Sequence, residues 1–128
     1  MHYWLTFAWM FLAANFENQR IILPTEQVAK VTVGESWEVV IAGNITTGYA
    51  WKAVSLPAGV VAVGEPKYLN PELKPGERPM PGRGGQFIFT FQAKSAGTGA
   101  IKFAYARPWE KDIAPVQLAE LKVEVREK

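Results

Sequence analysis

The sequence predicts an all-β sandwich of about seven to eight strands, and three observations carry this prediction. Short segments with a two-residue apolar period recur along the chain, Gly and Pro separate them, and no period of 3.6 residues persists beyond two turns. With 48% apolar residues, the 128-residue chain can bury the core that two stacked sheets require. Strands at this spacing favour Greek-key connections of the immunoglobulin type.

The first part of the predicted sandwich holds four strand segments separated by short turns. Trp51 is the expected inward residue of the third segment, where the immunoglobulin pattern has its core tryptophan. Gly64 and Pro66 interrupt the fourth segment, which predicts an edge strand or a bulge. The segments are residues 27–33, 36–42, 49–54 and 60–69, and the second places Trp37, Val39 and Ile41 on one face.

The second part begins with the longest irregular stretch, residues 70–85, whose four Pro and four Gly exclude regular structure. Three strand segments follow, and residues 96–99 are expected to form the turn between the first two. In the last segment, Val116 and Leu118 fall out of step with the later apolar residues, so a bulge is expected near Ala119. The segments are residues 86–93, 100–106 and 116–126, with Phe87, Phe89, Phe91, Ile101, Phe103, Tyr105, Leu121, Val123 and Val125 inward.

The chain opens with a segment that carries no Asp, Glu, Lys or Arg. Residues 3–14 form a mostly apolar run, which is shorter than the ~20 residues of a transmembrane helix. Its length and the terminal Ala13 and Ala14 are typical of a secretory signal peptide; a strand or helix packed on the domain is the alternative. We expect residues 1–20 to be a signal peptide or an N-terminal extension and residues 21–128 to form the folded domain. The protein would be secreted or periplasmic if the run is a signal, and cytoplasmic otherwise.

The composition argues against the common enzyme chemistries. The absence of Cys excludes disulfides, thiolate metal sites and a cysteine nucleophile in this chain. The single histidine, His2, lies in the N-terminal run, which argues against histidine-based catalysis and metal binding. A net charge of +2 is too small to indicate a nucleic-acid partner. We therefore expect no catalytic residues, metal, cofactor or small-molecule substrate.

Three loop segments are the candidates for function: residues 44–49, 81–85 and 107–109. In a seven-strand sandwich, the loops after strands two, four and six lie at the same end, so these segments should share one rim. The rim would combine an exposed Trp, an Arg, two Thr and flexible Gly backbone. Trp and Arg are enriched among interface hot spots, which indicates a protein-binding edge.

Motifs in these segments resemble the chagasin family, the protein inhibitors of papain-like cysteine peptidases. They are Asn-Ile-Thr-Thr-Gly-Tyr-Ala-Trp at residues 44–51, Gly-Arg-Gly-Gly at 82–85, and Ala-Gly-Thr at 96–98 leading through Phe103 and Tyr105 to Arg-Pro-Trp at 107–109. The resemblance extends over about residues 25–125, with the motifs in order and suitably spaced. It implies a monomeric, immunoglobulin-like protein that binds such a peptidase tightly, reversibly and competitively.

The resemblance also implies a role for each loop. The first would enter the active-site cleft, with Thr46 and Thr47 near the catalytic cysteine and Gly48 shaping the tip. The other two loops would clamp either side, the Gly-rich loop by close backbone approach and Arg-Pro-Trp by packing on the enzyme surface. The implied peptidase-binding residues are Asn44, Ile45, Thr46, Thr47, Gly48, Tyr49, Gly82, Arg83, Gly84, Gly85, Arg107, Pro108 and Trp109.

Ile45 departs from the family pattern, which has Pro at this position. Pro would hold Asn44 extended, and its absence is expected to cost about 0.4–1 kcal/mol of preorganisation. Because the β-branched Ile45 still favours extended backbone, we expect weaker rather than absent inhibition. Asn44-Ile45-Thr46 is also an N-glycosylation sequence, and a glycan there would occupy the binding wedge, which favours a bacterial source.

Two other functions compete with inhibition. A non-inhibitory immunoglobulin-like adhesion or assembly module would share the fold without requiring three matched loops. A carboxylate-pair hydrolase would need two acids in a cleft, and Glu110 and Asp112 are only neighbours on one loop. The position of Trp109 separates the first two functions: exposure beside Thr46 and Gly84 favours the inhibitor, and burial in the core argues against it.

Overall fold

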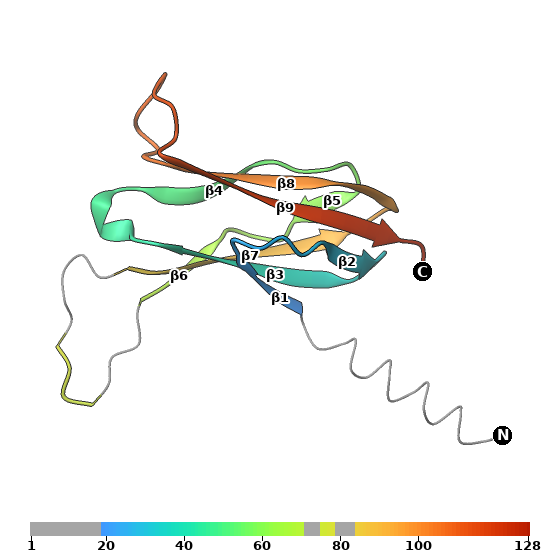
Figure 1. Ribbon diagram of the computed structural model, residues 1–128, viewed down its shortest axis with the longest axis horizontal. Helices are drawn as coiled ribbons and strands as arrows, with labels where there is room; N and C mark the ends of the chain where they lie inside the picture. The colour runs from blue at the N-terminus through green and yellow to red at the C-terminus, as the bar shows by residue number, and fades with distance from the viewer. Residues whose placement is uncertain (1–18, 71–74, 79–83) are drawn as a thin grey trace.

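The computed structural model describes residues 19–70, 75–78 and 84–128, which form two β-sheets stacked face to face (Figure 1). One sheet has the order β1-β3-β7-β5, with β6 also paired to β7, and the other has the order β2-β9-β8-β4. The predicted all-β sandwich is confirmed, with nine strands among the described residues. They are β1 (Gln19–Leu23), β2 (Ala29–Thr32), β3 (Ser36–Gly43), β4 (Ala50–Ser55), β5 (Val60–Ala62), β6 (Lys67–Leu69), β7 (Gly85–Ala93), β8 (Gly97–Ala106) and β9 (Gln117–Arg126).

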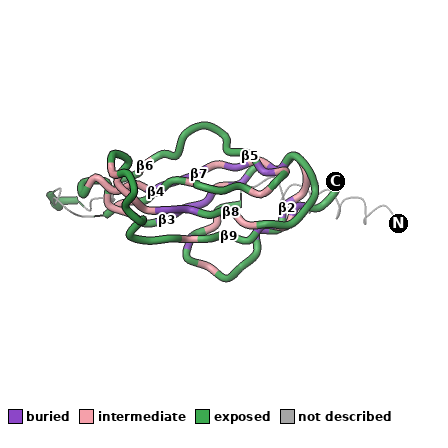
Figure 2. The backbone as a smooth tube through the Cα atoms, turned by 90° about the horizontal axis from the view of Figure 1, so that it is seen from above, coloured by how far each residue is buried: buried purple, intermediate pink, exposed green. Residues whose placement is uncertain are grey.

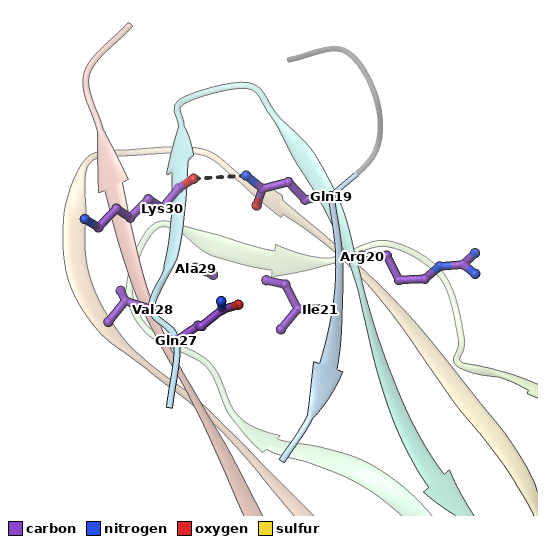
Figure 3. Close-up of a pocket in the computed structure, with 7 residues that line it drawn as sticks. All are labelled: Gln19, Arg20, Ile21, Gln27, Val28, Ala29 and Lys30. Atoms are coloured by element: carbon purple, nitrogen blue, oxygen red, sulfur yellow. Dashed lines mark hydrogen bonds between the residues drawn. The ribbon is translucent and has the colours of Figure 1, made fainter. Parts of the chain in front are cut away.

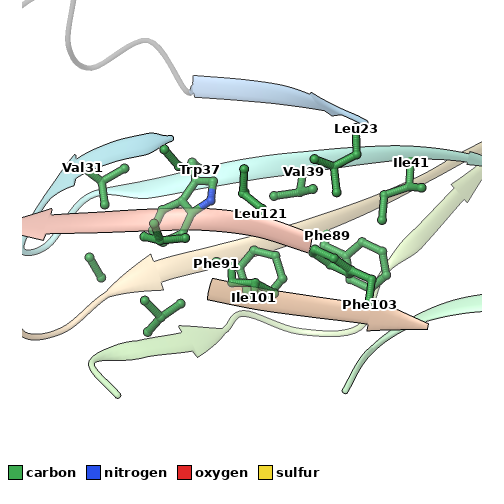
Figure 4. Packing of buried hydrophobic residues seen from close by; sticks show 14 of the residues in the cluster. Leu23, Val31, Trp37, Val39, Ile41, Phe89, Phe91, Ile101, Phe103 and Leu121 are labelled. Atoms are coloured by element: carbon green, nitrogen blue, oxygen red, sulfur yellow. The ribbon is translucent and has the colours of Figure 1, made fainter. Parts of the chain in front are cut away.

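The core lies between the two sheets and consists of the inward-facing residues that alternate along the long strands (Figure 4). The predicted stripe of Phe87, Phe89 and Phe91 on β7 is buried, and Phe103 from the opposite sheet packs edge-on against the last two rings. Trp51 is buried as expected. Figure 2 shows the buried residues along the inner strands and the exposed ones on the surrounding loops. The least exposed large side chains are Trp37, Phe91, Phe103, Ile101, Leu121 and Val39.

Strand β1 was missed by the sequence analysis, which placed the first strand after residue 24. It runs parallel to β3, with Gln19 opposite Trp37. Its sequence, QRIIL, begins with two polar residues, and Ile22 is 62% exposed, so only Leu23 is fully buried. An edge strand with this weak alternation has little signal in a single sequence. The predicted signal peptide or extension lies outside the described residues up to residue 18.

Two expectations for the last strands were wrong. Strand β8 begins at Gly97, so most of the predicted turn at residues 96–99 is strand. Strands β8 and β9 pair without a register shift from Gly97 opposite Val125 to Tyr105 opposite Gln117, so there is no bulge near Ala119. The apolar Leu118 instead faces solvent, 75% exposed, because the pleat continues unbroken through it.

Irregular pairing occurs at the outer strands. The interrupted segment 60–69 forms two short strands, β5 and β6, both paired to β7, in agreement with the expected edge position. Strand β4, at the other sheet's edge, shifts register between Ala53 and Ser55. A bulge of this kind bends the strand and breaks the regular row of backbone groups.

The strand register brings three connections to one end of the sandwich. Gly43, the last residue of β3, pairs with Gly85, the first of β7, and Ala50, the first of β4, pairs with Ala106, the last of β8. The connection at residues 44–49 therefore lies beside the segment that leads into β7 and the segment that leaves β8. The connection between β3 and β4, the start of β7 and the end of β8 lie toward the left of the molecule in Figure 1.

The described surface also has hollows, and one of them reaches the loop end, where Ala50, Ala106 and Pro108 help to line it. Another of about 510 Å³ opens between β1 and β2, lined by the residues shown in Figure 3. Gln19 and Arg20 on its wall pair with the beginning of β3, opposite the end that carries the loops. Among the described residues, no helix has the length and apolar character needed to cross a membrane.

Candidate functional site

The tip of the first loop is a single 3₁₀ turn, Ile45–Thr47, between β3 and β4. Asn44 caps it: its side-chain Oδ1 accepts from the backbone N–H of Thr46 at 3.1 Å and from the Thr46 hydroxyl at 2.6 Å. The Thr47 hydroxyl donates to the Asn44 carbonyl at 2.8 Å. Asn is a preferred cap because its short side chain reaches back to the first free amides of the turn. Ile45, Thr46 and Thr47 are exposed, so the tip presents two hydroxyls and one apolar side chain.

Gly48 ends the turn, and two constraints require glycine there. Its φ of 85° lies in the left-handed region, and its N–H closes the turn on the Ile45 carbonyl at 3.0 Å. A Cβ at this position would lie 2.5 Å from Cη2 of Trp109, which packs over the glycine. The first loop and the Arg-Pro-Trp loop are therefore in direct contact.

Trp109 is 66% exposed and lies against the tip rather than in the core. The sequence analysis asked for an exposed Trp109 beside Thr46 and Gly84; the side chain is exposed, and the neighbour that it covers is Gly48. A large aromatic side chain held rigidly at the surface provides contact area at little further entropic cost on binding. Trp109 is thus a suitable anchor for a protein partner.

Arg107 links the same two loops from behind. Its Nε donates to the Thr47 carbonyl at 3.2 Å, and its guanidinium carbon lies 4.4 Å from the centre of the Tyr49 ring. The side chain is half-buried, whereas Pro108 beside it is exposed. In the free protein, Arg107 therefore positions the tip, and Pro108 and Trp109 form the outer surface of this loop.

The third loop reaches the tip through its last two glycines. A Cβ on Gly84 would lie 3.3 Å from the Gly43 carbonyl oxygen and 3.9 Å from Cβ of Asn44. A Cβ on Gly85 would collide with the Leu69 carbonyl oxygen, so this backbone packs where only glycine fits. The other predicted residues of this loop, Gly82 and Arg83, lie outside the described residues.

Tyr105 belongs to the site although it was not among the predicted peptidase-binding residues. Its hydroxyl accepts from the Asn44 N–H at 2.8 Å and donates to the Asn44 carbonyl at 3.1 Å. Its ring stacks on Tyr49 and Trp51, with centroids 5.4 Å and 4.9 Å apart. The sequence could have indicated this role, because a tyrosine among the inward-facing residues at the end of a strand needs a hydrogen-bond partner for its hydroxyl.

The site carries interaction surface rather than reactive groups. Among the described residues, no three His, Cys, Asp or Glu side chains gather closely enough to hold a metal ion. What the structure brings together is an exposed Trp109, two exposed threonines and closely packed glycine backbone on one edge. Such an edge suits recognition of a concave protein surface.

Comparison with known proteins identifies this arrangement. The model of the chagasin family of peptidase inhibitors matches residues 30–124. Chagasin from Trypanosoma cruzi is 36% identical over 83 residues, 62% of this chain and 71% of that protein. Amoebiasin-1 from Entamoeba histolytica is 32% identical over 79 residues, 62% of this chain and 72% of that protein.

A solved structure has the same fold. It is the cysteine protease inhibitor EhICP2 from Entamoeba histolytica, with a TM-score of 0.64 and 21% identity, covering 86% of this chain and 98% of that one. The family match spans most of the chain and contains all three loop motifs. The chain therefore belongs to the chagasin family of peptidase inhibitors.

Proposed function

We propose that this protein is a tight-binding, reversible, competitive inhibitor of papain-like cysteine peptidases, and that its three loops enter and flank the active-site cleft. The observation that carries the proposal is the contact between the loops: Trp109 covers Gly48, and Arg107 holds the Thr47 carbonyl. These contacts make one rigid edge from separate segments. A partner that binds this edge pays little to order it.

The tip geometry supports inhibition rather than cleavage. Hydrolysis needs the scissile carbonyl held at near-attack distance and angle to the nucleophile. The Ile45–Thr47 segment is instead closed into a 3₁₀ turn by the Gly48 N–H, the Asn44 side chain and the Thr47 hydroxyl. Presenting a peptide bond of this turn as substrate would break several of these hydrogen bonds. The exposed Thr46 and Thr47 can therefore lie near a catalytic cysteine without being turned over.

The three loops also provide enough breadth for a stable complex. A standard protein–protein interface buries about 1,600 Å² in total and depends on a few central anchors. Trp109 on one side of the tip and the backbone at Gly84 on the other would contact the two walls of a cleft while the turn occupies its floor. This division of roles needs no reactive group on the inhibitor.

The test is inhibition of active-site-titrated papain by the purified protein, with trypsin as the control peptidase. We expect stoichiometric, reversible inhibition of papain that substrate competes away, with an intact inhibitor after prolonged incubation and no effect on trypsin. Absence of papain inhibition at micromolar protein would contradict the proposal and leave the adhesion or assembly module as the better function. Progressive cleavage at the tip would show a substrate in place of an inhibitor.

A further inference from the structure

Tyr105 occupies the junction between the two sheets at the base of the tip. It is the penultimate residue of β8, half-buried, and its ring contacts Tyr49 and Trp51, with interplanar angles of 29° and 30°. Trp51 is itself tied to β3, because its Nε1 donates to the Ala42 carbonyl at 2.9 Å. The stacked rings therefore restrict where the Tyr105 hydroxyl can lie.

That hydroxyl binds both backbone groups of one residue, Asn44, which is 61 positions away in sequence. A hydroxyl can donate and accept at the same time, so both bonds form together. These two hydrogen bonds resemble the pair that two opposite residues exchange in an antiparallel β-sheet. They therefore hold the backbone at Asn44, one residue after β3 ends at Gly43. Unlike a ladder partner, Tyr105 belongs to the other sheet.

Asn44 is also the residue from which the tip is built. Its Oδ1 binds the backbone and hydroxyl of Thr46, and its carbonyl accepts from the Thr47 hydroxyl as well as from Tyr105. A carbonyl has two lone pairs, so it can accept both bonds. Any rotation of the Asn44 peptide groups would therefore move both exposed threonines.

We propose that Tyr105 is a positioning residue for peptidase binding: its hydroxyl fixes Asn44 and through it the orientation of Thr46 and Thr47, without contacting the peptidase. This inference rests on the proposed function and adds to it a residue behind the binding surface. Removing the hydroxyl leaves the ring stack and the fold in place but frees the base of the tip. The loss then appears in affinity and in local exchange rather than in global stability.

The test compares Tyr105→Phe with Tyr68→Phe. Both remove one phenol oxygen at the base of the loops, but the hydrogen bond of the Tyr68 hydroxyl within the described part of the chain goes to the Gly43 carbonyl, at 3.4 Å, one residue before Asn44. For Tyr105→Phe we expect a papain inhibition constant about tenfold higher, with a melting temperature close to that of Tyr68→Phe. Tyr68→Phe should stay within about twofold of the unmodified protein in inhibition.

Hydrogen exchange of the Asn44 amide, followed in the free protein by NMR, provides a readout independent of any peptidase. Tyr105→Phe should speed this exchange by about tenfold, while the Val39 amide in the middle of β3 keeps its rate. If the unmodified protein inhibits papain and Tyr105→Phe inhibits it equally well, the inference is overturned. If the unmodified protein fails to inhibit papain, the proposed function fails. In that case, the exchange experiment alone tests whether the Tyr105 hydroxyl fixes Asn44. An Asn44 exchange rate that Tyr105→Phe leaves unchanged overturns this restraint, and a faster rate supports it.

Discussion

The two turns that flank β3 use the same backbone device for different purposes. The turn before it contains Gly34 at φ 96°, and the turn after it contains Gly48 at φ 85°. A Cβ on Gly34 would meet nothing within 4 Å, whereas one on Gly48 would strike Trp109. The first glycine serves only its own turn, and the second also makes room for another loop. A glycine with positive φ therefore does not by itself identify the end of the sandwich that carries the site. The packing of Trp109 over Gly48 does identify it.

The first and largest expected effect concerns stability at the Gly34 end. Trp37 is the second residue of β3 and almost fully buried, so Trp37→Ala should lower the free energy of unfolding by about 3–5 kcal/mol. Its indole N–H has no hydrogen-bond partner among the described residues, so Trp37→Phe should cost less. Urea denaturation measures both. An equal loss for the two variants would show that a phenyl ring does not replace the packing of the indole at this position.

The second prediction separates the two glycines directly. Gly48→Val should weaken papain inhibition by roughly 2–4 kcal/mol, since the side chain both strains φ and displaces Trp109. Gly34→Val carries the same type of backbone strain without a clash, so it should reduce stability and leave the inhibition constant of the folded protein unchanged. Inhibition constants and urea midpoints of both variants provide the comparison. Equal inhibition by the two variants would mean that the tip does not enter the cleft.

The third prediction tests the other side of the Gly48 contact. Trp109→Ala should weaken binding by about 2 kcal/mol or more, as expected for an aromatic anchor. Because the side chain is 66% exposed, the melting temperature should change little. Calorimetric titration with inactivated papain and a thermal melt measure the two quantities. A large stability loss with unaltered affinity would make Trp109 a structural residue.

The smallest expected effect concerns Ile45. Asn44 already has φ −127° and ψ 103°, close to what a following proline imposes, and position 45 is the first of the turn, where proline is well tolerated. Ile45→Pro should therefore improve binding by at most about 0.4–1 kcal/mol, through the unbound loop. A ratio of inhibition constants measured side by side tests this. A gain of a hundredfold would show that the Asn44 restraints described above do not hold the tip.

The sequence was most informative where one face of a long strand is buried. The Phe stripe of β7 and the apolar alternation of β3 predicted the core, and the rule for loop ends predicted the shared rim. It failed at the weakly alternating β1 and at Leu118, where an apolar residue on a solvent face imitated a register shift. Within the site, motif spacing located the loops. The hydrogen bond of Arg107 to the Thr47 carbonyl and the two hydrogen bonds of the Tyr105 hydroxyl to Asn44 instead depend on distances between segments far apart in the sequence. Periodicity along a single chain does not encode such distances.

The irregular edge of β4 has a consequence for behaviour at high concentration. A strand at a sheet edge offers a row of backbone donors and acceptors to which another copy of the chain could add, beginning a growing aggregate. On β4 that row carries Lys52 and then loses its register between Ala53 and Ser55. A second copy aligned on this edge would bring two lysines together and would find its partners out of step after a few residues. Both features therefore oppose the addition of a second copy of the chain along β4.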